Sequence, residues 1–311
     1  MRPNQAEILL TVLDEGSIAA AARRLNRSRT TVSTALSALE DELDAQLFER
    51  TGKELYPTPL AWAIQPDCLR YLQTYRQIAA RCEQERQGVE VALRLARDDA
   101  LPEAFWRATI RELKKRFPLT GVAVYLAPPQ ELADLVETQA VDLAFGLTSR
   151  YLEQDYEQLH FQELGSLRQL IVSAPDHPLC RLPLVRHEDL EVHTQITMAF
   201  MEEDELVPEQ AVSANYLAMT QFELMRDAIL EGTGWGRLPL PVIAQALKEE
   251  RLRQLRAPDA VTWQAYYRLN IRGQGQGQVA NWLASQVRSY LKPFAKEPLI
   301  NVTSAGQARQ N

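Results

Sequence analysis

Four arginines and a run of short hydroxyls near the start of the chain have the side chains and spacing to contact DNA. The arginines lie between positions 16 and 39, a window that contains no acidic residue: Arg23, Arg24, Arg27 and Arg29. Hydroxyl side chains follow directly at Thr30, Thr31, Ser33 and Thr34. A guanidinium group can bond a phosphate or a guanine edge, and small polar side chains let a helix backbone approach a groove.

The surrounding pattern predicts two short helices that would position these groups. Residues 4–14 form an amphipathic helical pattern that ends at Gly16, and Ser17 is suited to cap a second helix over 18–25. Ser28 would cap a third helix that continues to about residue 41. Its apolar residues gather on one face and its hydroxyls on the other. A solvated polar face is the alternative, but the capped pair of helices and the arginine cluster favour a helix-turn-helix.

Residues 47–53 predict a hydrophobic anchor followed by a short hairpin that ends near Pro57. Arg50 and Lys53 would lie on this wing and contact the DNA backbone or minor groove. Surface charge beside a turn is the alternative explanation for both residues.

Residues 58–87 predict one long helix, with Pro66 inside it and Gly88 closing it. Apolar residues recur along it at spacings of three and four: Ala61, Ile64, Cys68, Tyr71, Tyr75, Ile78 and Cys82. Such a heptad-like seam indicates dimerisation. Cys68 and Cys82 could sense redox state, although small buried side chains are the simpler interpretation.

From residue 89 the pattern changes to alternating strands and helices, which predicts an α/β domain. Strands are expected at 91–96, 121–127, 141–147, 167–174, 193–200, 235–239 and 263–271, and helices at 102–116, 130–138, 219–231, 240–249 and 279–291. Gly232, Gly234 and Gly236 superficially resemble a dinucleotide-binding loop. They follow a helix rather than a strand, so they are interpreted as helix capping and strand entry. Residues 295–311 are expected to form a flexible tail.

Overall composition argues for a soluble protein and against several function classes. The 311-residue chain carries a formal net charge of −7, so any DNA-binding charge must be local. It has no apolar run of membrane-spanning length and no leader pattern. Three cysteines without a CxxC pair suggest reduced thiols in the cytoplasm. Neither the four histidines nor any nucleophile pattern indicates a metal site, a cofactor or an enzyme.

The N-terminal part of the chain contains Gly16-Ser17, Val32-Ser33, Leu39-Glu40, Leu43 and Leu47-Phe48-Glu49-Arg50. In these residues the chain strongly resembles the LysR-type transcriptional regulators. Similar runs occur downstream at Val141-Asp142-Leu143-Ala144, His177-Pro178-Leu179 and residues 232–239. Arg29-Thr30-Thr31 departs from the Gln-Pro and small residue of many members, so the recognised bases can differ. Tyr56-Pro57-Thr58 departs from the usual exit of the wing.

The resemblance implies a winged helix-turn-helix over 1–57, a linker and dimerisation helix over 58–88, and an effector domain over 89–294. That domain would have two lobes, one at 89–162 and 266–292 and the other at 163–265. Family membership further implies a homotetramer on promoter DNA and a small-molecule effector between the lobes.

In such a domain ligands lie where strands end and helices begin. These positions are Arg97, Asp98, Asp99, Pro128, Pro129, Gln130, Thr148, Ser149, Phe200 and Met201. Two acids in the first loop, and two prolines without amide hydrogens in the second, favour a cationic or amphoteric effector over a simple carboxylate. Alternatively, Asp98 or Asp99 caps the helix that follows.

The leading hypothesis is therefore a metabolite-responsive transcription factor. Arg29, Thr30, Ser33 and Thr34 would read bases, and Arg27, Thr31, Arg50 and Lys53 would anchor phosphates. A solute-binding protein of the same two-lobed fold is the second class, and an α/β enzyme is the third. The helix-turn-helix pattern argues against the second, and the missing catalytic constellation against the third.

Overall fold

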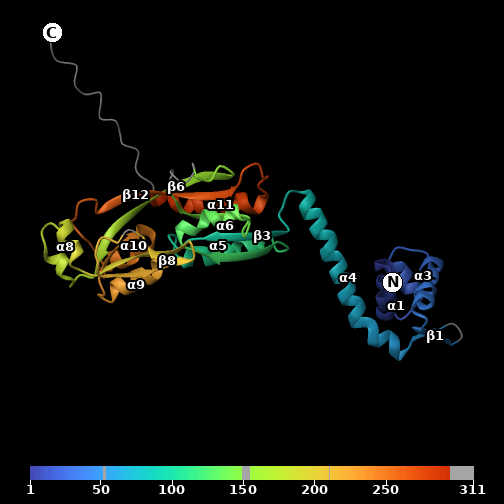
Figure 1. Cartoon of the computed structure of the whole chain (residues 1–311). Coiled ribbons are helices and arrows are strands. Elements are labelled where there is room, and N and C mark those ends of the chain that lie inside the picture. Colours follow the sequence, from blue (N-terminus) through green and yellow to red (C-terminus); the bar gives the residue numbers. More distant parts are fainter. Residues whose placement is uncertain (52–53, 149–154, 210, 295–311) are drawn as a thin grey trace, which may run out of the picture. The chain divides into compact units, whose positions relative to one another are not determined.

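The computed structural model describes residues 1–51, 54–148, 155–209 and 211–294 (Figure 1). Contacts within the chain divide it into two compact units, Met1–Gln87 and a second that begins at Gly88.

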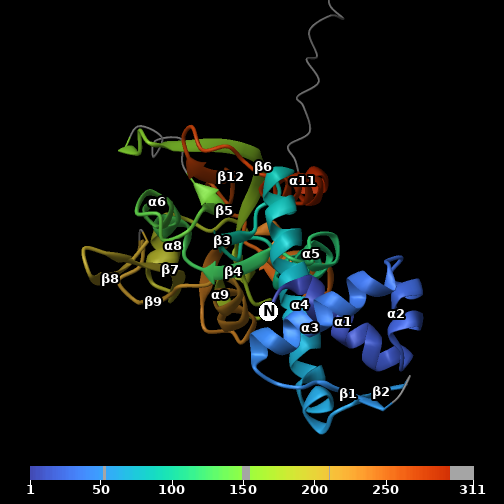
Figure 2. The same cartoon turned by 90° about the vertical axis from the view of Figure 1, so that its right-hand side faces the viewer.

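The first unit contains three short helices, a hairpin and one long helix. These are α1 (Pro3–Glu15), α2 (Ile18–Arg24), α3 (Arg29–Leu43), β1 (Phe48–Thr51), β2 (Glu54–Pro57) and α4 (Pro59–Arg86). The hairpin lies beside the helices (Figure 2). Val32, Leu36 and Leu39 of α3 are buried with Ile8 and Leu9 of α1 in one apolar core. The amphipathic pattern of each helix therefore determines which face packs inward.

The serine caps expected from the sequence are present. Ser17 Oγ accepts from the Ala20 amide at 3.2 Å, and Ser28 Oγ accepts from the Thr31 amide at 3.0 Å. Between the two helices Asn26 adopts a left-handed conformation with φ of 52°, which asparagine tolerates better than most residues. The caps and this turn fix where α3 begins.

The long helix α4 buries part of the predicted seam within its own chain. Ala61 and Cys68 are buried in the core of the first unit, whereas Tyr75 and Ile78 are 50% and 55% exposed. The seam prediction was therefore wrong for its first half, because α1 covers those residues. Tyr75, Ile78 and Cys82, the residues of its second half, are exposed.

The second unit is built on one ten-stranded sheet with the order β4-β3-β5-β12-β6-β10-β7-β8, in which β11 also pairs with β6 and β9 with β7. The strands are β3 (Ala92–Arg97), β4 (Gly121–Leu126), β5 (Leu143–Thr148), β6 (Leu159–Ser173), β7 (Gln195–Glu202), β8 (Glu205–Pro208), β9 (Tyr216–Met219), β10 (Trp235–Pro239), β11 (Arg253–Gln254) and β12 (Val261–Ile271).

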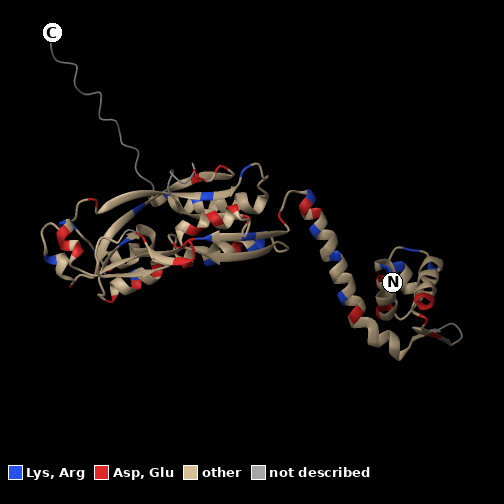
Figure 3. Ribbon diagram, in the orientation of Figure 1, with Lys and Arg blue, Asp and Glu red and all other residues tan. Residues whose placement is uncertain are grey.

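Helices cover both halves of this sheet (Figure 1). We call the half with β3–β5, α5, α6 and α11 lobe one, and the half with β7–β11 and α8–α10 lobe two. The helices are α5 (Glu103–Arg116), α6 (Leu132–Glu137), α8 (His187–Glu191), α9 (Phe222–Leu230), α10 (Leu240–Lys248) and α11 (Gln278–Leu291). Short 3-10 turns add η1 (Pro129–Glu131), η2 (Pro178–Arg181) and η3 (Lys292–Phe294). Basic and acidic positions are intermixed over this unit in the view of Figure 3.

Two long antiparallel strands, β6 and β12, run from one lobe into the other. Their register shifts between Tyr266 and Tyr267, so a bulge interrupts the pairing where β12 also pairs with β5 of lobe one. The strands predicted at 167–174 and 263–271 were thus too short, and β8, β9 and β11 were missed. These three strands are only two to four residues long, which is too short for the alternation of apolar and polar residues that signals a strand.

The glycines after α9 have the structural roles expected of them. Gly232 has φ of +82° just beyond the end of the helix. A Cβ at Gly234 or Gly236 would lie 2.1 Å from the Thr194 carbonyl oxygen or 2.6 Å from that of Ile196. Close packing against the start of β7 therefore requires glycine at both positions.

Candidate functional site

The α3 helix presents the predicted polar residues on its outer face. Arg29, Thr30, Thr31 and Thr34 are exposed, and Ser33 is half-buried. The opposite face is anchored in the core. A helix fixed on one side and lined by short polar groups on the other has the shape and chemistry to enter a major groove.

The four arginines of the window differ in their surroundings. Arg24 pairs with Asp14 at 3.3 Å and with Glu15 at 3.0 Å, and Arg27 donates to the side chain of Asn4. Neither Arg23 nor Arg29 has an ion-pair partner within 4.0 Å among the described residues. The positive charge available to DNA is therefore concentrated at fewer arginines than the sequence suggests.

A carboxylate from α3 fixes the start of the wing. Glu40 Oε1 accepts from the amides of Leu47 and Phe48 at 2.8 and 3.0 Å. Arg50 lies in β1 opposite Leu55, but its side chain and the whole of Lys53 lie outside the described residues.

The structure places Asp98 in the interior of lobe one rather than in a cleft. The residue is fully buried. Its carboxylate accepts from the Leu147 amide at 2.7 Å, the Ala100 amide at 3.2 Å and the Tyr266 hydroxyl at 3.1 Å. Desolvation raises the pKa of Asp98 to about 7 against the effect of these bonds. The prediction that it contacts an effector is wrong, since its acceptors are committed to neighbouring strands.

Asp99 caps a helix, but in the other lobe. Its Oδ2 accepts from the Glu223 amide in the first turn of α9 at 2.9 Å. Glu223 Oε1 in turn accepts from the Glu103 amide at the start of α5, at 3.3 Å. Each lobe therefore caps a helix of the other, and the two carboxylates hold the lobes together at this point.

Replacing Asp99 with alanine is expected to lower the free energy of unfolding by about 1–2 kcal/mol, because the first turn of α9 loses its cap. Asp99→Asn keeps an acceptor oxygen and should retain most of that stability. Denaturant unfolding of the full chain measures both variants. An Asp99→Ala variant as stable as the parent would show that the cap contributes nothing.

The other residues predicted to line a cleft lie in several different parts of the domain. Arg97 is buried, donates to the Asp98 carbonyl oxygen at 3.1 Å and pairs with Glu103, so it anchors α5. Phe200 and Met201 pair with β8, and the Met201 amide donates to Glu131 at 3.0 Å. Thr148 is buried at the end of β5, Pro128 precedes η1, and Ser149 lies outside the described residues. Of the predicted set, Pro129 and Gln130 line the cavity described next.

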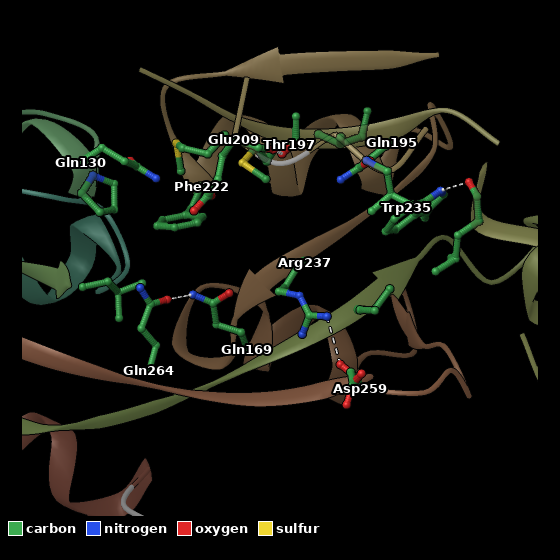
Figure 4. A pocket seen from close by; sticks show the side chains of 18 of the residues that line it. Gln130, Gln169, Gln195, Thr197, Glu209, Phe222, Trp235, Arg237, Asp259 and Gln264 are labelled. Atoms are coloured by element: carbon green, nitrogen blue, oxygen red, sulfur yellow. Dashed lines mark hydrogen bonds between the residues drawn. The ribbon is translucent and has the colours of Figure 1, made fainter. Parts of the chain in front are cut away.

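A cavity of about 340 Å³ lies between the lobes, mostly within lobe two (Figure 4). Its apolar lining includes Ile171, Leu190, Met198, Phe222, Met225 and Trp235. Its polar lining includes Gln130, Gln169, Gln195, Thr197, Glu209, Arg237, Asp259 and Gln264. An enclosure of this size, lined by both apolar side chains and convergent polar groups, suits a small organic molecule.

Neighbouring backbone and side chains position these polar groups. Gln195 Oε1 accepts from the Val212 and Ser213 amides at 2.6 and 3.1 Å, which fixes its orientation. Gln169 donates to Gln264 across β6 and β12. Arg237 donates to Thr262 Oγ1 at 3.0 Å and to the Asp259 carbonyl oxygen at 2.9 Å. The cavity is therefore preorganised by the fold.

The sequence contained a signal for these residues that the strand analysis did not use. Gln169, Gln195, Arg237 and Gln264 are polar residues that lie beside apolar or aromatic residues in strands β6, β7, β10 and β12. A buried polar side chain needs a partner, so its presence in a core strand indicates an internal network or a ligand.

Two family models cover most of the chain. Residues 3–61 match the bacterial regulatory helix-turn-helix protein of the lysR family, and residues 86–292 match the LysR substrate binding domain. The protein is a LysR-type transcriptional regulator. It is a DNA-binding regulator and not an enzyme.

Curated relatives agree with this family assignment. The chain is 26% identical over 298 residues to the multiple virulence factor regulator MvfR of Pseudomonas aeruginosa, covering 94% of this chain and 88% of the relative. It is 29% identical over 241 residues to the transcriptional regulator AceR of Acinetobacter baumannii, covering 77% and 80%.

Solved structures of full-length regulators share the fold. An OxyR mutant of Corynebacterium glutamicum aligns with a TM-score of 0.61 at 15% identity, covering 94% of this chain and 93% of the other. A probable transcriptional regulator of Pseudomonas aeruginosa aligns with a TM-score of 0.63 at 16% identity, covering 92% and 97%. No described helix of the LysR-type regulator is long and apolar enough to cross a membrane. The described residues contain no cluster of metal-ligating side chains.

Proposed function

We propose that this LysR-type regulator reads promoter DNA with α3 and that a small molecule in the interlobe cavity controls it. Arg29, Thr30, Ser33 and Thr34 contact bases, and Arg27, Thr31, Arg50 and Lys53 contact phosphates. The exposure of Arg29 and the hydroxyls on a helix held by the core is the observation that supports this most. Since the protein would bind promoter DNA, we infer that it acts in the cytoplasm.

Apart from Gln130, the effector-binding residues of this proposal differ from those expected from the sequence. They are the side chains that line the cavity, chiefly Gln130, Gln195, Glu209, Phe222, Trp235 and Arg237. Phe222 connects the cavity to the capped start of α9, where Asp99 holds lobe two against lobe one. A ligand against Phe222 can thereby change the angle between the lobes.

Selection of duplexes from a random pool with the full chain tests the DNA-binding part. Enrichment of a site with two related half-sites, resistant to nonspecific competitor, is the expected result. The proposal is contradicted by binding that shows no sequence preference after selection. Measuring the enriched duplex at several salt concentrations then counts the phosphate contacts.

We further propose that two chains pair through the exposed part of α4 and that two such dimers form a tetramer. Tyr75 and Ile78 lie on one helical face and are about half exposed in the single chain. Large apolar side chains that are exposed together on one face of a helix are typical of a surface that a second helix covers.

Replacing both Tyr75 and Ile78 with glutamate is expected to weaken self-association by at least about tenfold, because charges would be buried in an apolar seam. Light scattering over a concentration series measures the change. Gln77→Glu, on the same exposed stretch of α4 but off this face, is the matched control and should leave the mass unchanged. An unchanged mass in the double variant would place the dimer interface elsewhere.

A further inference from the structure

Glu209 and Arg237 lie on opposite walls of the cavity, and Asp259 lies beside Arg237. Figure 4 shows Glu209, Thr197 and Gln195 on one side and Arg237, Gln169 and Gln264 on the other. The space between the walls is bounded by Phe222 and Trp235. A molecule that enters it meets the carboxylate of Glu209 on one wall and the guanidinium of Arg237 on the other.

Arg237 is held in place by neutral groups. It donates hydrogen bonds to a hydroxyl and a backbone carbonyl, and no carboxylate forms an ion pair with it within 4.0 Å in the part of the chain that the structure describes. A half-buried guanidinium stays charged, and burial lowers its pKa while Asp259 and Glu209 raise it. Its remaining N–H groups can bind a carboxylate or a similar anionic oxygen.

Glu209 is fixed on the facing wall by its backbone. Its amide donates to the Met198 carbonyl oxygen at 2.7 Å, and its own carbonyl oxygen accepts from Thr197 Oγ1 at 2.7 Å. Although Glu209 is an exposed residue, the surrounding cavity wall desolvates its carboxyl and raises its pKa, which a hydrogen bond from Gln130 and the charge of Arg237 partly oppose. Gln130 Oε1 is itself buried without a partner in the described structure. The acceptor that this wall offers to an N–H donor is therefore the Glu209 carboxylate.

We propose, on the basis of the effector site assigned above, that the effector is an amphoteric molecule with an apolar body. Its ammonium or other N–H cation binds Glu209, its acidic oxygen binds Arg237, and its body packs against Phe222 and Trp235. The amphoteric class agrees with the class expected from the sequence, but the acid that selects it is Glu209 rather than Asp98 or Asp99.

Matched sets of compounds on one apolar body test the class of effector. The first set is 4-(aminomethyl)benzoate, 4-methylbenzoate and 4-methylbenzylamine, and the second is phenylalanine, 3-phenylpropanoate and phenethylamine. Calorimetry with the full chain is expected to show that the dipolar member of at least one set binds at least about tenfold more tightly than both others. Equal or tighter binding of a singly charged member in both sets, or no binding of either dipolar member, overturns the proposal.

Variants that remove one charge from the cavity then show which side chain binds the amine of the compounds and which binds their acid. Glu209→Gln should remove the advantage that the amine confers and leave the affinity for the acid-only compound unchanged. Arg237→Gln retains N–H donors for Thr262 and Asp259. It should remove the advantage that the acid confers and leave the affinity for the amine-only compound unchanged. Because Glu209 is exposed, its variant is expected to fold even if the Arg237 variant does not, and a dipolar preference that survives Glu209→Gln contradicts the assignment.

A blocking variant separates this inference from the proposed function. Val212 lines the cavity and is 37% exposed, so Val212→Trp can fill the space without disturbing the core. If Val212→Trp abolishes binding but the charge variants do not, the cavity is the effector site and the amphoteric class is wrong. If Val212→Trp also leaves binding unchanged, the cavity assignment itself fails.

Discussion

Arg29→Ala is expected to weaken binding to the selected DNA site by about 1–3 kcal/mol per half-site, the range for loss of one good base contact. Arg29 begins α3, is exposed, and lacks an ion-pair partner among the described residues, so its guanidinium is available to the groove. Fluorescence anisotropy with a labelled duplex at fixed salt measures the change.

Arg24→Ala is the matched control for this prediction. Both residues are exposed arginines of the same window, but Arg24 already pairs with Asp14 and Glu15. Its replacement should therefore weaken DNA binding less than that of Arg29. If Arg24→Ala has the larger effect, α3 is not the helix that reads the site.

Asp98→Ala is expected to lower the free energy of unfolding of the effector domain by roughly 3–5 kcal/mol, because it leaves the buried Leu147 and Ala100 amides without acceptors. Denaturant unfolding followed by tryptophan fluorescence measures it. Asp142→Ala removes a more exposed acid that bonds Arg94 and should cost roughly 1 kcal/mol. Equal losses in the two variants would show that burial of Asp98 carries no special weight.

The pH dependence of stability provides a separate test of Asp98. Its pKa is raised in the fold from an ordinary 3.8 to about 7, so the folded chain holds a proton that the unfolded chain has released. The resulting stabilisation is complete below about pH 4 and is lost as the pH rises through about 7. The stability difference between the parent and Asp98→Asn should therefore narrow over that range. A constant difference would contradict the raised pKa.

The fold of the DNA-binding unit could be predicted from the sequence because its determinants are local. Ser17 and Ser28 cap helices through bonds to residues three positions away. The apolar positions of α3 face the core as their helical period requires. Interactions of this kind depend on neighbours along the chain and are readable without the tertiary structure.

The candidate effector site could not be placed in the same way. Asp98 and Asp99 follow a strand, as ligand-binding residues often do, but distant groups decide their roles. Tyr266 and the Leu147 amide occupy Asp98, and the α9 amide of Glu223 occupies Asp99. Glu209 reaches the cavity from a segment whose sequence has no clear periodicity. Long-range packing, not local pattern, therefore determines which acid faces a ligand.

The central claim is that α3 reads base sequence, and a single-base substitution series of the selected duplex tests it most directly. The affinity of the parent and of Arg29→Ala is measured for every substituted duplex at one salt concentration. The account predicts that Arg29→Ala loses discrimination at one base pair of each half-site and keeps the preferences elsewhere. A uniform loss of affinity with all preferences intact would contradict base reading by Arg29 at the start of α3.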